Sequence, residues 1–308
     1  MKHFTIILLV ILNSFLQKEK VNEQNYIDDY YQNIYKADLE YMTENYEKAF
    51  ELYQSAFYSC VPINTQMYYE ISNFAETCAI LKKDDLALVF MKKKIANGST
   101  LESMQRNSNF DNVFASEGGK ELIANYDTLR KEYLSSLNLD LRQEIAEMKA
   151  NDQKYRAQAG FMKSDEMKAK QEEIDDYNTK RLIEIFDDFG YPNEKVIGGF
   201  NIDKTPVSID GILLHTSDSI RVNYFIPKLK EYIKKGECSP SVLGPVIDQY
   251  YLYNGEPQVN GTYTKPDGSY SNMITNLEKV NENRISIGLP PIWLQEKKDS
   301  LTKAKYGY

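Results

Sequence analysis

The spacing of small and aromatic residues between positions 37 and 56 constrains the fold of this chain more than any other feature. Small residues let two helices approach closely, and aromatic side chains fill the space between them. The residues with this spacing are Ala37, Tyr41, Tyr46, Ala49, Tyr53 and Ala56. They predict two antiparallel helices that are joined at Glu44-Asn45, and Pro62 ends the second helix.

A second, weaker copy of the pattern follows. Its members are Tyr68, Phe74, Ala75, Ala79, Ala87, Phe90 and Met91, with a polar turn at 82–85 between the two helices. The two copies together resemble tetratricopeptide repeats, which are helix pairs with a period of about 34 residues. Ala49 and Ala87 are 38 positions apart, and the loop "VPINTQ" accommodates the excess. Residues 99–137 fit a degenerate third unit or a cap, so the resemblance implies a tetratricopeptide-like array over residues 31–137.

Residues 138–308 are predicted to form a second, α-helical domain with one β-hairpin. The length of 308 residues fits two domains at roughly 100–200 residues each. The hairpin is indicated by the turn "KPDG" between "GTYT" and "SYSNMI", because Pro at the second place and Gly at the fourth suit a four-residue turn. The fold class expected for the whole chain is therefore mainly α.

The N-terminal segment is typical of a secretory signal peptide. Met1-Lys2-His3 is followed by the apolar run "FTIILLVILNSFL", which is short for a membrane span. Residues 1–16 are predicted to be the signal and residues 17–30 a polar lead-in. We therefore expect an exported protein, periplasmic or extracellular. The alternative is an uncleaved segment that anchors the protein to a membrane.

Charge and composition exclude several classes of partner. The net charge of −8 disfavours nucleic acid or an anionic membrane surface as the main partner. The three cysteines and two histidines fit no metal motif, so no metal site is expected. No cofactor is expected either, because the sequence has no phosphate-binding loop and no dinucleotide fingerprint.

Several motifs of the C-terminal region resemble a bacterial domain family of unknown function, in the same order along the chain. "MKANDQKYR" is similar to the family's Met-x-x-x-Asp-Gln-x-x-Arg helix, and "LLHTSD" to its Leu-x-x-His-Ala-Asp. "GEPQVNGTYT" is similar to Gly-x-x-Gln-x-Tyr-Gly-Thr-Gln, and "NENRISIGLPPI" to Arg-x-x-x-Gly-Leu. Gln249 stands where the family usually has Arg, and Tyr263 replaces its last Gln. The resemblance implies a shared fold and a shared polar site, and it implies no reaction.

The candidate site residues come from these motifs. His215, Asp152 and Arg156 are the candidates for catalysis, and His215 is the only histidine beyond the predicted signal. Asp152 and Arg156 are four positions apart, so the alternative for them is a simple ion pair on one helix face. The candidates for ligand binding are Gln153, Gln258, Thr262 and Arg284. The alternative for Gln258 and Arg284 is that they satisfy loop carbonyls where the hairpin packs.

Two functions follow from different parts of the sequence. The leading hypothesis is a non-enzymatic interaction protein that binds a protein or peptide on the repeat region. It requires an open face on residues 30–137. The alternative is an uncharacterised enzyme, such as a hydrolase, with a site around His215 and the 255–264 hairpin. It requires His215, Asp152, Arg156 and Gln258 to line one pocket. A third hypothesis is a purely structural protein of the cell envelope.

Overall fold

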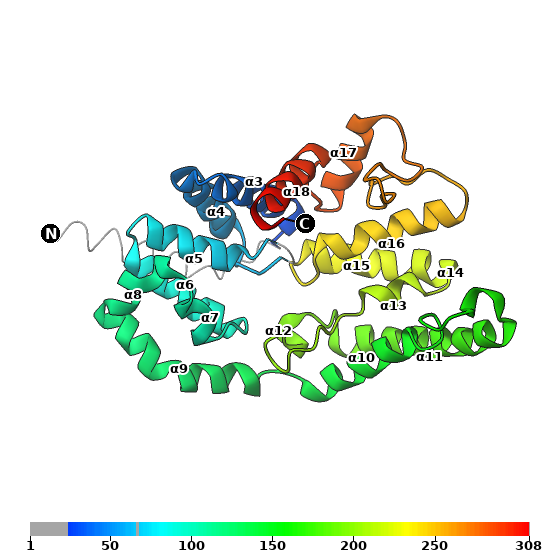
Figure 1. Ribbon diagram of the computed structural model, residues 1–308, viewed down its shortest axis with the longest axis horizontal. Coiled ribbons are helices and arrows are strands. Elements are labelled where there is room, and N and C mark those ends of the chain that lie inside the picture. The colour runs from blue at the N-terminus through cyan, green and yellow to red at the C-terminus, as the bar shows by residue number, and fades with distance from the viewer. Residues whose placement is uncertain (1–23, 66–67, 308) are drawn as a thin grey trace.

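The computed structural model describes residues 24–65 and 68–307, and this part of the chain is mainly helical, as predicted (Figure 1). The predicted signal, residues 1–16, and positions 17–23 of the polar lead-in lie outside the described residues. Within the described ranges, no helix is both long enough and apolar enough to cross a membrane.

The first two helix pairs lie where the residue spacing predicts them. After a short helix α2 (Tyr26–Asp29), the pairs are α3 (Tyr31–Met42) with α4 (Tyr46–Ser59), and α5 (Glu70–Ile80) with α6 (Asp84–Ala96). Ala37, Ala49 and Ala56 are fully buried between their helices. Their small side chains permit the close approach that the sequence indicates.

Residues 99–137 do not form a third pair of equal helices. They form α7 (Leu101–Gln105), the 3₁₀ turn η1 (Ser108–Phe110), α8 (Asp111–Ala115) and the long α9 (Glu117–Ser135). Gly118-Gly119 lies in the first turn of α9. A Cβ at Gly119 would lie 2.1 Å from the Val113 carbonyl oxygen, so this position admits only glycine where α8 and α9 meet.

The C-terminal region continues from α9 along one edge of the molecule and then folds back (Figure 1). Its elements are α10 (Leu139–Asp152), η2 (Phe161–Lys163), α11 (Asp165–Phe189), α12 (Glu194–Ile197), α13 (Asp210–Leu214), α14 (Asp218–Ile220), the π-helix η3 (Arg221–Phe225), α15 (Ile226–Lys234), α16 (Pro240–Tyr253), α17 (Leu277–Ser286) and α18 (Ile292–Tyr306).

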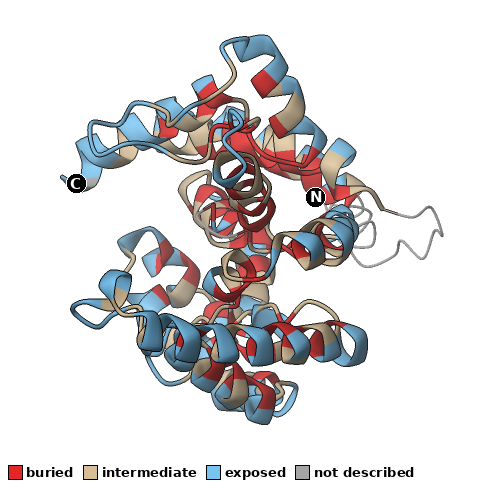
Figure 2. Ribbon diagram, turned by 90° about the vertical axis from the view of Figure 1, so that its right-hand side faces the viewer, coloured by how far each residue is buried: buried red, intermediate tan, exposed pale blue. Residues whose placement is uncertain are grey.

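The last helices return to the first repeat and pack against it. The Tyr31 hydroxyl donates to the Ile233 carbonyl over 3.0 Å, and the Tyr35 hydroxyl donates to the Gly288 carbonyl over 2.6 Å. Lys298 on α18 forms a buried ion pair with Asp38 on α3. One hydrophobic core consequently runs from Tyr26 to Leu294, and buried residues are concentrated in the middle of the molecule (Figure 2).

The predicted β-hairpin is reduced to a hairpin-shaped loop. The Gly268 amide donates to the Lys265 carbonyl, so the chain turns where "KPDG" predicts it. Among the described residues, however, pairing is limited to isolated bridges at Thr264–Tyr270 and Gln258–Met273, and no strand forms. Side chains bind backbone N–H groups that would otherwise pair between two strands. Gln258 accepts from the Tyr263 amide, and Asp248 accepts from the Thr262 amide.

Candidate functional site

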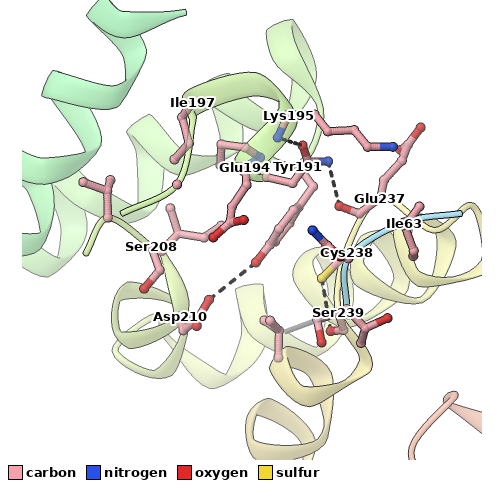
Figure 3. Close-up of a pocket in the computed structure, with 18 of the residues that line it drawn as sticks. Ile63, Tyr191, Glu194, Lys195, Ile197, Ser208, Asp210, Glu237, Cys238 and Ser239 are labelled. Carbon is pink, nitrogen blue, oxygen red and sulfur yellow. Dashed lines mark hydrogen bonds between the residues drawn. The ribbon is translucent and has the colours of Figure 1, made fainter. Parts of the chain in front are cut away.

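A hollow of about 420 Å³ lies where the repeat region meets the C-terminal region (Figure 3). Five parts of the chain that are distant in sequence line it, namely 63–65 with Tyr69, Asn97, and residues within 191–200, 206–210 and 236–242. A second hollow of about 480 Å³ shares Ile63, Tyr191 and Gly236 with the first. We call the two hollows together the junction cleft.

A buried carboxylate fixes the repeat-side wall of the junction cleft. Glu70 at the start of α5 accepts hydrogen bonds from the Thr65 amide (2.7 Å) and the Thr65 hydroxyl (2.6 Å). The Tyr30 hydroxyl donates to Glu70 and accepts from the Ile63 amide. Burial raises the pKa of Glu70 to about 7. These contacts hold the backbone of 63–65 in place, so this wall is formed before any ligand binds.

The opposite wall is built from helix ends. Asn193 caps α12, and its side-chain amide donates to the Glu237 carbonyl over 2.9 Å. Ser239 caps α16, whose second residue is Ser241. The Asn193 hydrogen bond thus ties the start of α12 to the segment that precedes α16.

The interior of the first hollow carries a poorly paired carboxylate. Tyr191 and Asp210 point toward each other, and Glu194 projects toward the same space (Figure 3). The Tyr191 hydroxyl is 3.4 Å from Asp210 Oδ1, which is a long hydrogen bond. Burial raises the pKa of Asp210, and the Tyr191 hydroxyl and Lys149 act in the opposite direction. Burial also raises the pKa of the Cys238 thiol, which makes it a poor nucleophile.

Exposed apolar side chains gather at the junction cleft. Tyr69 and Phe200 line the first hollow and are 60% and 52% exposed, and Val61 and Phe189 line the second and are 55% and 44% exposed. Single exposed apolar residues are ordinary on a protein surface, whereas these four lie around one concavity.

The structure brings together the three residues predicted for catalysis, at a place outside the junction cleft. His215 Nδ1 lies 2.8 Å from Asp152 Oδ1, and Arg156 Nη1 lies 3.4 Å from the same carboxylate oxygen. Gln153 donates to Asp152 Oδ2 over 2.7 Å. Arg156 also forms a bidentate ion pair with Asp175 on α11. The i,i+4 pair of Asp152 and Arg156 is therefore one edge of a larger polar cluster between α10, α11 and α13.

Asp152 is buried and remains ionised in this cluster. Burial alone would raise its pKa, but hydrogen bonds from His215 and Gln153, together with the electrostatic influence of His215 and Arg156, lower the pKa below its ordinary value. A buried carboxylate that holds Nδ1 of an imidazole fixes the orientation of the ring.

Gln258, Thr262 and Arg284 form a separate group that organises loops. The Gln258 amide donates to the carbonyls of Tyr263 (2.8 Å) and Ser271. Thr262 donates from its hydroxyl to Asp248 on α16, and Arg284 donates to the carbonyls of Pro290 and Asn260. The loop that contains Gln258 lies on the opposite side of α16 from α13 (Figure 1).

None of the seven predicted site residues lines the junction cleft. The sequence did not indicate the cleft, because its walls come from segments that are far apart along the chain. The available signals were the helix end at Gly190-Tyr191-Pro192 and the pair Gly198-Gly199. In the described part of the chain, no three His, Cys, Asp or Glu side chains are grouped so that they could hold a metal ion.

A comparison of this chain with protein-family models, curated proteins and solved structures finds no match. The resemblances to tetratricopeptide repeats and to the bacterial domain family therefore stay predictions.

Proposed function

We propose that this protein is an exported, tetratricopeptide-like interaction protein that binds an extended peptide segment of a partner protein in the junction cleft. The observation that carries the proposal is the group of half-exposed apolar side chains around the cleft, Val61, Tyr69, Phe189 and Phe200. Aromatic and aliphatic anchors around a concave, preformed surface are typical of peptide recognition.

The location differs from the open repeat face that the sequence suggests. The C-terminal region covers one face of α3. The contacts that hold it there are hydrogen bonds from Tyr31 and Tyr35 and the Asp38–Lys298 ion pair. A partner cannot use this α3 face without displacing α15 and α18. The junction cleft is a concave surface to which the repeat region contributes, through residues 63–65 and 69 and Asn97.

Charge favours a basic segment as the occupant. Glu194, Asp210 and Glu237 line the first hollow, and Lys195 is the one Lys or Arg that does so among the described residues. In this hollow the Tyr191 hydroxyl contacts the Asp210 carboxylate through a long hydrogen bond. A Lys or Arg side chain of the partner would therefore stabilise the negative charge of Asp210. The net charge of −8 also attracts a basic segment at long range.

Selection from a random peptide library on the wild-type protein tests this proposal. We expect the enriched peptides to carry Lys or Arg between apolar residues. Phe200→Ala should weaken their binding about tenfold or more, because an anchoring aromatic contributes roughly 1.5–2 kcal/mol or more. Trp293→Ala is the matched control, since Trp293 is 56% exposed and does not line the cleft. Equal losses in both variants, or no enrichment, would contradict the proposal.

The second candidate function is an enzyme centred on His215. The 2.8 Å contact between His215 Nδ1 and Asp152 Oδ1 favours it, because such a carboxylate fixes the tautomer that leaves Nε2 to accept a proton. The test is a screen of ester, amide and glycoside substrates with wild type and His215→Asn. Turnover that is lost in His215→Asn supports the enzyme. The same rate in both proteins, or no turnover, contradicts it.

A further inference from the structure

Residues 61–65, which follow α4 at the junction cleft, form an extended segment with two backbone edges. Cys60 has extended backbone angles (φ −132°, ψ 156°), and neither a turn nor a helix follows before Thr65. In an extended chain the N–H and C=O groups of one residue point to the same edge, and those of the next residue point to the opposite edge. Alternate residues of 61–65 therefore present their backbone groups to opposite sides.

The repeat region already pairs the first edge, which consists of Val61, Ile63 and Thr65. The Val61 carbonyl accepts from the Tyr26 hydroxyl over 2.8 Å. The Tyr30 hydroxyl accepts from the Ile63 amide over 3.1 Å and lies 3.3 Å from the Ile63 carbonyl oxygen. The Thr65 amide donates over 2.7 Å to the buried carboxylate at the start of α5. Side chains thus occupy the place that a neighbouring strand would take on this edge.

The second edge, which consists of Pro62 and Asn64, is unpaired. In the described part of the chain, the Asn64 N–H group and the carbonyl groups of Pro62 and Asn64 have no hydrogen-bond partner. Asn64 lines the first hollow, and its side chain accepts from the Ile71 amide over 3.3 Å. Pro62 and Asn64 are half-buried, whereas Ile63 and Thr65 are buried. Because the first edge points into the repeat region, the second edge faces the junction cleft.

We infer that the partner segment binds as a β-strand along this second edge, through backbone hydrogen bonds to Pro62 and Asn64. The inference rests on the proposed function and specifies how the same cleft holds its peptide. Asn64 donates one hydrogen bond and accepts one, and Pro62 accepts one, so the edge offers three. When a strand is added to an exposed edge, backbone bonds supply affinity and side-chain pockets supply specificity. Asp210 and Glu194 in the first hollow then select a basic side chain of that strand.

Pro62 keeps the pairing short. Proline has no N–H group, so the edge has one donor and two acceptors. Proline on an edge also hinders pairing with further strands. The edge therefore suits a short segment of a partner protein and disfavours a sheet between copies of this chain.

N-methylation of single peptide bonds in a ligand tests the inference on the wild-type protein. The probe is the tightest-binding peptide from the library selection, with each backbone N–H group methylated in turn. In both parallel and antiparallel pairing, the Pro62 and Asn64 carbonyls accept from peptide N–H groups two residues apart. Methylation at those two positions should weaken binding about fivefold to tenfold in calorimetric titration, as expected for a lost hydrogen bond. Methylation of the residue between them should weaken it less than about twofold.

A pair of protein variants isolates the Asn64 N–H group. Asn64→Pro and Asn64→Ala both remove the side-chain bond to the Ile71 amide, but only the proline variant lacks the backbone donor. A proline at position 64 favours an extended conformation of Ile63, which is the one present. Asn64→Pro should bind the unmethylated peptide about fivefold more weakly than Asn64→Ala does.

Two results would overturn the inference and leave the proposed function in place, provided that Phe200→Ala still weakens binding. One is equal affinity for all the N-methylated peptides, and the other is equal affinity of Asn64→Pro and Asn64→Ala. A selection without enriched peptides, or wild-type affinity in Phe200→Ala, would contradict the proposed function and the inference together. The methylated peptides are measured on wild type, so they decide the question even where Asn64→Pro yields little folded protein.

Discussion

Removing the positive charge of Lys298 should strongly destabilise the protein, because α18 is held to the first repeat by a buried ion pair. Lys298 Nζ lies 2.5 Å from Asp38 Oδ2, and both side chains are buried. Asn73 donates to Asp38 Oδ1 over 3.1 Å, and the Lys298 ammonium lies 3.8 Å from the centre of the Tyr68 ring. In Lys298→Met, Asp38 stays buried with the Asn73 hydrogen bond and without its cation.

The free energy of unfolding should fall by about 3–5 kcal/mol, which is the range measured when one partner of a buried ion pair is removed. Burial already raises the pKa of Asp38, and Lys298 opposes that rise. Without Lys298 the pKa rises further. The folded state then binds a proton that the unfolded state has lost, so the variant loses stability as pH rises above the unfolded value of about 4.

Urea denaturation followed by circular dichroism measures both effects. The double variant Asp38→Asn, Lys298→Met should recover most of the loss, because no unpaired charge remains. Lys279→Met is the matched control: Lys279 pairs with Glu282 on the surface of α17, so its loss should cost less than about 1 kcal/mol. A cost for Lys298→Met as small as that of the control, or no recovery in the double variant, would refute the reasoning.

Three other predictions concern the supports of the fold. Because burial raises the pKa of Glu70 to about 7, the wild type should lose up to about 3 kcal/mol as pH rises from 4.5 to 7, and urea titrations of Glu70→Gln should lack this loss. Gln258→Leu removes three hydrogen bonds inside the hairpin-shaped loop and should cost about 3 kcal/mol by urea denaturation, whereas a cost below about 1 kcal/mol would speak against its structural role. Gly119→Ala places a Cβ against the backbone of Val113 and should lower the melting temperature, whereas Gly118→Ala meets only the flexible end of Leu88 and should lower it less.

The helices were predictable because their signals are local. Ala37 and Ala49 mark a close helix contact by their size, and Gly190 ends α11 with a positive φ of 74° that glycine adopts freely. The π-helix before Pro227 could not be read from the sequence in the same way, since the proline shows that the helix must adjust but not how.

The arrangement of the helices was less accessible. Asp38 and Lys298 are 260 positions apart, and nothing local pairs them. The packing of α18 against α3 therefore could not be read from the repeat pattern. The same holds for the junction cleft, whose apolar residues Val61, Tyr69, Phe189 and Phe200 carry no pattern along the chain.

The candidate site was predictable in part. The i,i+4 spacing of Asp152 and Arg156 indicated their contact, and the resemblance to the bacterial family placed His215 with them, 63 positions away from Asp152. The same motifs placed Gln258 with His215. In the structure Gln258 is fully buried, and its side chain forms hydrogen bonds inside its own loop. A hairpin with so little backbone pairing is marginally stable by itself, so a side chain that binds its backbone groups helps to hold it.

Hydrogen exchange of the protein with and without a selected basic peptide tests the central claim most directly. The account predicts slower exchange in 61–65, 191–200 and 236–242, the segments around the junction cleft, and unchanged exchange in the loop 255–270. Slower exchange confined to the outer surfaces of α4 and α6, with no change at the cleft, would contradict it.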